Sequence, residues 1–311
     1  MRPSPCLLYT SIQRVGPSTG LPTRTMQGDV GFVHTLSHGD TRHPVLLPGT
    51  VIEVYEDAQR AFDVADRLQT PVFVLSDLDL GMNLWMTAPL PYTERAIDRG
   101  KVLDAEALAR VTEWARYRDV DGDGIPYRTL PGTADPRAAY FTRGSGHDEH
   151  ALYTEDPDVY EANMDRLRRK IDGARTLLPA PLVEESGNRV AICAYGSTHH
   201  AVVEARHQLA DRGVETDYLR IRGLPLHPGV AEFIARHDRV YVAEQNRDGQ
   251  MEALLRQELP GELADRLRSI RHFNGVPIDA EAISDPLLAG ELAQREPADD
   301  RAAAAHHVPV A

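Results

Sequence analysis

The stretch Arg189-Val-Ala-Ile-Cys-Ala-Tyr-Gly-Ser-Thr198 decides the fold of the C-terminal part of the chain. Its unbroken apolar run, followed by Gly-Ser-Thr, predicts a buried strand that turns directly into a helix. We expect Ser197 or Thr198 to cap that helix, although the amides of a helix N-terminus are also able to bind an anion. A strand–turn–helix unit of this kind is typical of α/β folds.

The same alternation continues towards the C-terminus. Strands are expected at 214–221, 239–243 and 267–272, each after an amphipathic helix. Alternating helices and strands indicate a mostly parallel sheet covered by helices. We therefore assign residues 189–290 to one compact α/β domain. Residues 291–311, which include a run of alanines and little else to bury, are expected to form a disordered tail.

A second α/β unit is expected near the N-terminus. Apolar residues at helical spacing over 58–68 precede an apolar run at 71–75, which predicts a helix followed by a buried strand. We assign residues 1–95 to this unit. Residues 96–188 are expected to form an irregular extension with a helix at about 104–116, one long helix and a linker at 179–188.

Composition excludes several classes of function. The net charge of −13 and the pI of about 5.4 disfavour nucleic acid as a partner. The two cysteines, Cys6 and Cys193, are too few for the four thiolates of an iron–sulfur cluster, so any cluster must lie on another chain. Membrane spans need roughly 20 consecutive apolar residues, and the apolar runs here are much shorter. The sequence predicts a soluble, cytoplasmic protein.

The Gly- and Pro-rich segment Gln13-Arg-Val-Gly-Pro-Ser-Thr-Gly-Leu-Pro-Thr23, with Gln27 shortly after it, predicts a shaped loop. This segment closely resembles a signature loop of 2-oxoacid:ferredoxin oxidoreductase alpha subunits, and among them the 2-oxoglutarate type. Further stretches resemble the same family in the same order, over roughly residues 12 to 290. They are Asp119 to Gly132, Arg143 to Glu149 with Tyr153 to Asp156, and Glu244 to Met251.

The resemblance implies a fold and an activity. The N-terminal unit would be part of a pyrimidine-binding domain for thiamine diphosphate, and the C-terminal unit would be similar to the transketolase C-terminal domain. The family oxidatively decarboxylates a 2-oxoacid to an acyl-coenzyme A and reduces ferredoxin. Thiamine diphosphate and Mg²⁺ are shared with or held by a beta subunit, and the iron–sulfur cluster lies on a partner chain. The implied partners are therefore the beta subunit, ferredoxin, the 2-oxoacid and coenzyme A.

The resemblance also implies a substrate-binding set, made of Arg14, Gly16, Pro17, Ser18 and Thr19. In the family, the arginine of this loop is similar in position to the residue that holds the substrate carboxylate. A guanidinium offers a planar pair of donors that matches a carboxylate. The hydroxyl groups would add donors, and the Gly-Pro frame would allow close approach of the backbone. The alternative for Arg14 is an ordinary loop arginine paired with a surface carboxylate.

The sequence also departs from the family pattern. A Tyr-Pro-Ile-Thr-Pro-Ser-like motif and a cofactor-binding glutamate are expected before the signature loop, and neither precedes it here. The Gly-Asp-Gly…Asn motif of beta subunits is also missing. The sequence therefore predicts an N-terminally truncated alpha subunit that is inactive alone, with no catalytic residue and no metal ligand of its own. Two alternatives are a non-catalytic assembly subunit that binds the beta subunit, and an unrelated ligand-binding or calcium-binding protein.

Three polar motifs allow a functional and a structural interpretation. Asp119-Val-Asp-Gly-Asp123 resembles the start of a calcium loop, but Leu130 stands where the last acidic ligand belongs, which favours an aspartate-stabilised turn. His147-Asp-Glu-His150 has the right residue types for a metal, yet its Gly-rich context favours a solvated turn. Glu244-Gln-Asn246 follows a strand, where α/β sheets place ligands, and we expect this edge to face a partner subunit.

Overall fold

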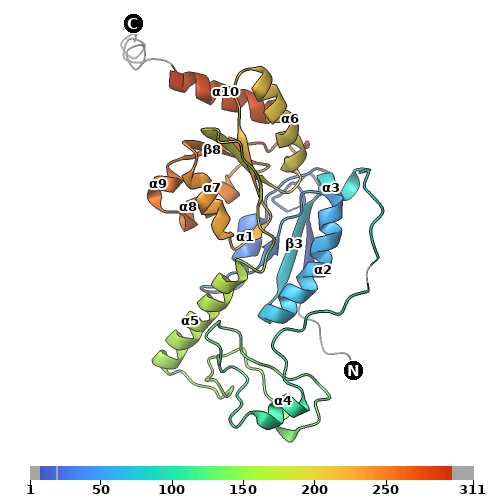
Figure 1. Cartoon of the computed structure of the whole chain (residues 1–311), viewed down its shortest axis with the longest axis vertical. Coiled ribbons are helices and arrows are strands. Elements are labelled where there is room, and N and C mark those ends of the chain that lie inside the picture. Colours follow the sequence, from blue (N-terminus) through green and yellow to red (C-terminus); the bar gives the residue numbers. More distant parts are fainter. Residues whose placement is uncertain (1–7, 19, 93, 296–311) are drawn as a thin grey trace.

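A computed structural model gives the fold of residues 8–18, 20–92 and 94–295. The chain forms two mostly parallel sheets with helices on their faces, and a third, irregular lobe projects below them (Figure 1). The expected α/β class is therefore confirmed. None of the described helices is both long enough and apolar enough to cross a membrane.

The first sheet has four strands in the order β1-β3-β2-β7. Strands β1 (Leu8–Gln13), β3 (Val72–Asp77) and β2 (Val45–Leu46) are parallel, and β7 (Gly223–Leu224) is antiparallel to β2. Strand β1 reaches Gln13, inside the segment expected to be loop, because it pairs with β3 along its whole length. Strand β7 comes from the C-terminal half of the chain, so both halves build this sheet.

The second sheet has the order β4-β6-β5-β8-β9. All neighbours are parallel except β4, which lies antiparallel to β6 at the edge. Strand β4 lies within the segment expected to be a linker, and its pairing with β6 gives that segment regular structure. The strands are β4 (Leu182–Glu184), β5 (Val190–Tyr195), β6 (Asp217–Ile221), β8 (Arg239–Glu244) and β9 (Leu267–Arg271).

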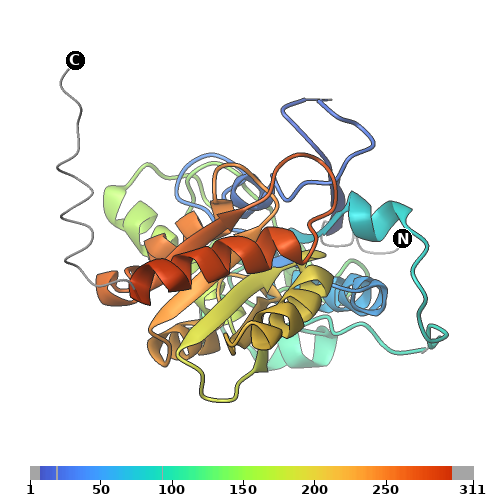
Figure 2. The ribbon, with the colours of Figure 1, turned by 90° about the horizontal axis from the view of Figure 1, so that it is seen from above.

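Helices cover both faces of the second sheet. Helices α6 (Thr198–Asp211) and α10 (Glu281–Arg295) lie side by side on one face, as Figure 2 shows from above. The other face carries α7 (Pro228–Ala235), α8 (Gln250–Glu258) and α9 (Gly261–Ala264). Helix α10 corrects the expectation of a disordered tail from residue 291. Glu291 is buried there, where it accepts a hydrogen bond from the Tyr241 hydroxyl at 2.8 Å.

The first sheet is covered by α2 (Val51–Leu68), which begins at an N-cap where the Thr50 hydroxyl accepts a hydrogen bond from the Glu53 amide. Short helices α1 (Val30–His34) and α3 (Leu78–Met82) flank the sheet. Apolar residues from the uncovered face of this sheet, such as Phe73 and Leu75, join those of the second sheet in a single core cluster. The two units therefore pack through a common apolar core.

The lobe between residues 83 and 156 is largely irregular, as predicted, and α5 (Pro157–Ala174) leads back from it to the body (Figure 1). The helix expected at 104–116 ends early, as α4 (Ala105–Arg110). The Arg137 guanidinium donates hydrogen bonds to the carbonyl oxygens of Leu108 and Val111, at 2.8 and 2.9 Å. A side chain thus satisfies the carbonyls that further helical turns would have used.

Candidate functional site

The signature loop forms a closed bend over residues 14–24. The Val15 amide donates to the Arg24 carbonyl at 3.0 Å, and the Leu21 amide donates back to the Val15 carbonyl at 3.3 Å. Inside the bend, the Gly16–Pro17 peptide is cis and Ser18 has a φ of 55°. Thr19, which belongs to the predicted substrate-binding set, lies outside the described residues. The bend is a defined structure stabilised by its own backbone.

Arg14 lies where β1 ends. Its neighbour Gln13 is buried, and the Gln13 side-chain oxygen accepts a hydrogen bond from the Asp29 amide at 2.9 Å. Arg14 itself is exposed, and within the described parts of the chain its guanidinium contacts no hydrogen-bonding or ion-pairing partner. Because β1 and β3 are parallel, Arg14 stands at the carboxyl edge of the sheet, where α/β folds bind ligands.

The second domain contacts this bend at Gly275. The Thr25 amide donates to the Gly275 carbonyl at 3.1 Å. Gly275 has a φ of +88°, and a Cβ on it would lie 3.1 to 3.2 Å from side-chain atoms of Arg24, Leu21 and Val15. Glycine is required there both by the backbone conformation and by the close approach of the bend.

Gln27 follows the bend and is fully buried between the two domains. Its side-chain oxygen accepts from the Thr198 hydroxyl at 3.1 Å and from the Gln245 amide at 3.0 Å. Its side-chain nitrogen donates to the Tyr195 carbonyl at 2.9 Å. Its own backbone carbonyl accepts from the Tyr195 hydroxyl and from the Asn246 side chain. All of these partners belong to the C-terminal domain.

Comparisons with known proteins give relatives of the kind that the signature loop resembles. The family "Pyruvate flavodoxin/ferredoxin oxidoreductase, thiamine diP-bdg" matches residues 1–115. The alpha subunit of 2-oxoacid:ferredoxin oxidoreductase 2 from Aeropyrum pernix is 35% identical over 80% of this chain and 39% of its own length. The 2-oxoglutarate synthase subunit KorA of Archaeoglobus fulgidus is 28% identical over 93% of this chain and 72% of its own length.

A solved structure gives the same result. The 2-oxoglutarate:ferredoxin oxidoreductase from Magnetococcus marinus, with 2-oxoglutarate, coenzyme A and succinyl-CoA bound, superposes with a TM-score of 0.80 at 28% identity. The match covers 91% of this chain and 48% of that chain. Over most of its length, this chain is similar to alpha subunits of 2-oxoacid:ferredoxin oxidoreductases. It spans about two fifths of the length of the Aeropyrum relative, at 39%.

The N-cap expected at the start of α6 is not formed. Ser197 and Thr198 make no side-chain hydrogen bond to the helix amides. The Ser197 hydroxyl instead donates to the Asp77 carboxylate at 2.6 Å, and the Thr198 hydroxyl donates to Gln27. The prediction was wrong because a partner from the first domain, distant in sequence, outcompetes the local amides.

The segment Glu244 to Asn246 was expected to face a partner subunit, but it is buried within this chain. Glu244 accepts hydrogen bonds from the amides of Met251 and Glu252 at the start of α8, at 2.9 and 3.1 Å. Gln245 and Asn246 hold Gln27. The sequence held one indication of this arrangement. In both halves of the chain, polar residues directly follow an apolar strand, and in the fold these residues meet at this edge.

Two carboxyl groups are buried at this edge. Burial raises the pKa of Asp77, although hydrogen bonds from Ser197 and from the Leu80 and Asp79 amides oppose the rise. Burial likewise raises the pKa of Glu244, against hydrogen bonds that its carboxylate accepts. Both carboxyl groups accept hydrogen bonds from donors of this chain. We therefore interpret them as structural groups between the two domains and not as ligands for an ion.

A second polar contact joins the domains at α2. The buried Arg220 guanidinium lies 2.5 Å from the Glu53 carboxylate, and Arg222 lies 3.2 Å from it. Burial by itself would raise the pKa of Glu53, but Arg220 and the Gly49 amide outweigh it and the pKa is lowered. Gly49 is packed so closely that a Cβ would lie 1.9 Å from an Arg220 nitrogen. The contact fixes α2 against β6.

Asp57 lies one turn further along α2 and is fully buried. Burial raises its pKa to about 6, although Arg60 and Arg222 oppose the rise. Its ordinary, unfolded value is about 3.9, so its contribution to stability is lost as the pH rises from about 4 through 6. Asp57→Asn should therefore increase the free energy of unfolding at pH 8 by about 1–2 kcal/mol, and the gain should vanish below about pH 4.

Chemical denaturation of both proteins at several pH values measures this difference. Glu56→Gln is the matched control, because Glu56 is exposed on the same helix. The control should show no pH-dependent change in stability relative to the wild type. A gain for Asp57→Asn that is equal at pH 4 and pH 8 would contradict the assigned role of burial.

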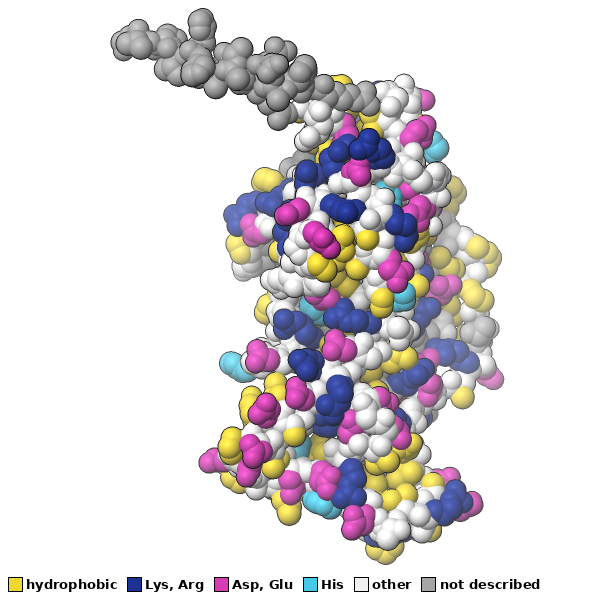
Figure 3. Space-filling model, turned by 60° about the vertical axis from the view of Figure 1, so that its left-hand side comes forward, with side chains coloured by type: hydrophobic (Ala, Val, Ile, Leu, Met, Phe, Trp, Pro, Cys, Tyr) yellow, Lys and Arg dark blue, Asp and Glu magenta, His cyan; other side chains and the backbone are white. Residues whose placement is uncertain are grey.

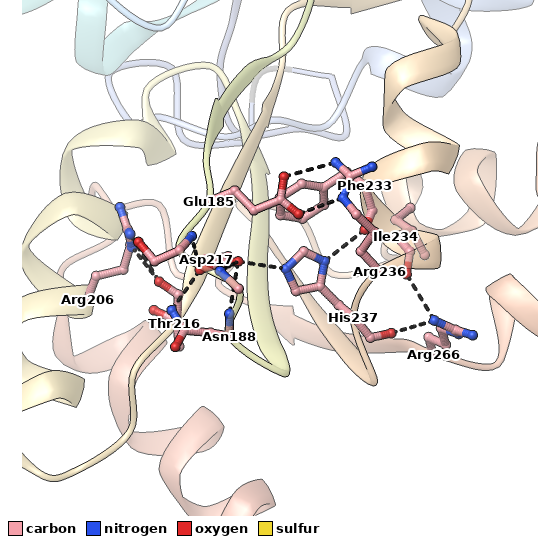
Figure 4. A network of polar contacts seen from close by, with 12 residues as sticks. Glu185, Asn188, Arg206, Thr216, Asp217, Phe233, Ile234, Arg236, His237 and Arg266 are labelled. Carbon is pink, nitrogen blue, oxygen red and sulfur yellow. Dashed lines mark hydrogen bonds and ion pairs between the residues drawn. The ribbon is translucent and has the colours of Figure 1, made fainter.

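One group of side chains has metal-ligand geometry. Atoms of Glu185, Asp217 and His237 lie within 4.8 Å of one another. Figure 4 shows that they are already engaged: the buried Asp217 carboxylate accepts from Asn188 and from His237, at 2.7 and 3.1 Å, and Glu185 pairs with Arg236 at 2.6 Å. An ion would have to break these contacts, so we interpret the group as structural.

The two other polar motifs are turns, as predicted. Asp119 accepts hydrogen bonds from the amides of Gly122 and Gly124, at 3.0 and 2.9 Å, while Lys101 pairs with the remaining aspartates of the motif. In the histidine-containing turn, the Asp148 carboxylate accepts from the amides of His150 and Leu152. Neither motif lies within the set of contacts that surrounds the signature loop.

Proposed function

We propose that this chain supplies the substrate-recognition loop of a 2-oxoacid:ferredoxin oxidoreductase and that its 2-oxoacid is 2-oxoglutarate. The names of the Archaeoglobus and Magnetococcus relatives support this choice of substrate. The chain would act within an assembly that contains a beta subunit, with coenzyme A as acyl acceptor and ferredoxin as electron acceptor. The iron–sulfur cluster would belong to a partner chain, since this one has two cysteines.

The observation that carries the proposal is the free guanidinium of Arg14. The described residues give it no carboxylate partner, which argues against an ordinary surface ion pair. It projects from a closed bend at the carboxyl edge of a parallel sheet. A bidentate pair with a substrate carboxylate would fix both the position and the orientation of the acid. Gly16, Pro17, Ser18 and Thr19 would line the approach to that carboxylate.

Thiamine diphosphate, when bound, would supply the nucleophilic carbon for decarboxylation of the 2-oxoacid. The bend fits a face of such a cofactor site, because Arg14, Pro17 and Ser18 are exposed at the carboxyl edge of a parallel sheet. The buried carboxylates nearby, Asp77 and Glu244, are engaged by donors and do not fit Mg²⁺. We therefore assign Mg²⁺ and the diphosphate to the beta subunit, and to this chain the orientation of the acid.

The test is an assay of the assembled enzyme, purified together with its beta subunit. Reduction of a low-potential dye should require both coenzyme A and a 2-oxoacid, with 2-oxoglutarate preferred over pyruvate. An assembly that forms and remains inactive with every 2-oxoacid would instead indicate the non-catalytic assembly subunit. Preference for pyruvate would contradict only the choice of substrate.

A further inference from the structure

Gln27 connects the signature loop to the second domain through hydrogen bonds of both its backbone and its side chain. Its backbone amide donates to the Gln245 carbonyl at 2.8 Å, in addition to the side-chain and carbonyl contacts given above. Every polar group of this residue thus has a partner in the ends of β5 and β8 or at the start of α6. A buried amide whose oxygen and nitrogen both have hydrogen-bond partners is strongly restricted in position.

The residues after Gln27 follow the same pattern. The Gln250 side chain donates to the Gly28 carbonyl at 2.6 Å and accepts from the Gly31 amide at 3.1 Å. On the other side of Gln27, Thr25 is held by Gly275. The segment 25–31 is therefore docked along the second domain, and the bend 14–24 is the part that projects from it.

We propose that Gln27 is a positioning residue, through which the C-terminal domain sets the place of the 14–24 bend and hence of Arg14. Within the bend itself, the backbone hydrogen bonds fix its shape but not its direction. Direction comes from the elements at the two ends of the bend, which are β1 and the docked segment. In the docked segment, the fully buried Gln27 makes the largest set of interdomain contacts. Only the step from Arg14 to the substrate depends on the proposed function.

The first experiment measures the loop directly in the full chain, without activity. In Gln27→Leu, the amides of Val15, Leu21 and Thr25 should exchange hydrogen at least roughly 10-fold faster than in the wild type, because their segment loses its anchor. Glu53→Gln is the matched control, since it weakens the other buried interdomain contact without touching the bend. In the control, these amides should exchange at the wild-type rate.

Thr198→Val provides a milder variant should Gln27→Leu fail to fold. It removes one hydroxyl donor to Gln27 and keeps the volume of the side chain. Faster exchange confined to the bend and the segment 25–31 supports the proposal. Unchanged exchange in both variants, or equal acceleration in the Glu53→Gln control, overturns it.

The second experiment is kinetic and uses the assembled enzyme. Thr198→Val and Gln27→Leu should raise the KM for the 2-oxoacid and leave the KM for coenzyme A unchanged, whereas in an Arg14→Ala background they should have no further effect on KM. Additive effects in that background would show that Gln27 does not act through Arg14 and would overturn that step. If exchange accelerates as expected but Arg14→Ala itself leaves KM unchanged, positioning stands and the proposed role of Arg14 fails.

Discussion

Arg14→Ala is expected to raise the KM for the 2-oxoacid by roughly 30- to 150-fold, with kcat little changed. A charge-assisted bidentate pair with a carboxylate contributes about 2–3 kcal/mol, and each 1.4 kcal/mol is about a tenfold change in binding. A contact that is equally strong in the ground state and in the transition state shows its loss in KM and not in kcat, and we expect the Arg14–carboxylate pair to be of this kind. Steady-state kinetics of the assembled enzyme measure it.

Arg14→Lys should recover part of the loss, because an ammonium keeps the charge but not the planar pair of donors. Arg24→Ala is the control, since Arg24 belongs to the same bend and contributes to it through its backbone carbonyl. Its KM should stay close to that of the wild type. A wild-type KM in Arg14→Ala would remove Arg14 from the substrate site, and equal effects at Arg14 and Arg24 would indicate a general loss of the loop.

The second large effect is expected for stability, at Asp217. Its carboxylate accepts hydrogen bonds from the amides of Ser186, Gly187 and Asn188 as well as from His237 (Figure 4). Asp217→Ala would leave the ring nitrogen of the buried His237 without its partner, and a buried polar group in that state costs about 1–3 kcal/mol. The amides of the exposed Ser186 and Gly187 would bind water instead. We expect the free energy of unfolding to fall by about 1–3 kcal/mol, measured by chemical denaturation.

The pH dependence of this loss has a defined sign. Burial alone would raise the pKa of Asp217, but hydrogen bonds from the Ser186 amide, His237 and Asn188 outweigh it and lower the pKa. A lowered acid pKa contributes stability above its unfolded value of about 3.9, and that contribution is lost as the pH falls through the folded pKa. The difference between wild type and Asp217→Ala should therefore shrink in acid.

Glu185→Ala serves as the control for Asp217. Glu185 is exposed and its pair with Arg236 lies at the surface, so its removal should cost less than about 1 kcal/mol. A loss of stability at Glu185 comparable to that at Asp217 would contradict the assignment of the buried carboxylate as the centre of this network. Stabilisation by added divalent cations, abolished in both variants, would instead support a metal.

The sequence predicted those elements whose pattern is local. The apolar run from Val190, ended by Gly196, predicts strand β5 and the turn after it. The helix and strand around residues 58–75 follow from the spacing of apolar residues. The edge strand β4 and the early end of α4 were missed because both depend on distant partners. Tertiary contacts to β6 and to Arg137 decide them, and local propensity does not.

The candidate site shows the same division. The bend and Arg14 could be found from the sequence through a recognisable motif. The roles of Thr198, Gln245 and Asn246 could not, because a polar residue after a strand has many possible partners and only the fold brings these to Gln27. Across the face drawn in Figure 3, acidic and basic side chains are interspersed, so the net charge of −13 also gave no pointer to the site.

Strand β7 limits how the two halves of such proteins can be exchanged between relatives. Gly223 and Leu224 complete the first sheet beside Val45 and Leu46, although they are encoded far downstream. Removing residues 189–295 would expose the edge of β2 and would also take away Arg220, the partner of Glu53. A hybrid that takes residues 189–290 from a relative must therefore also bring a strand that pairs with β2 of the recipient. Without such a strand, the two halves will not associate.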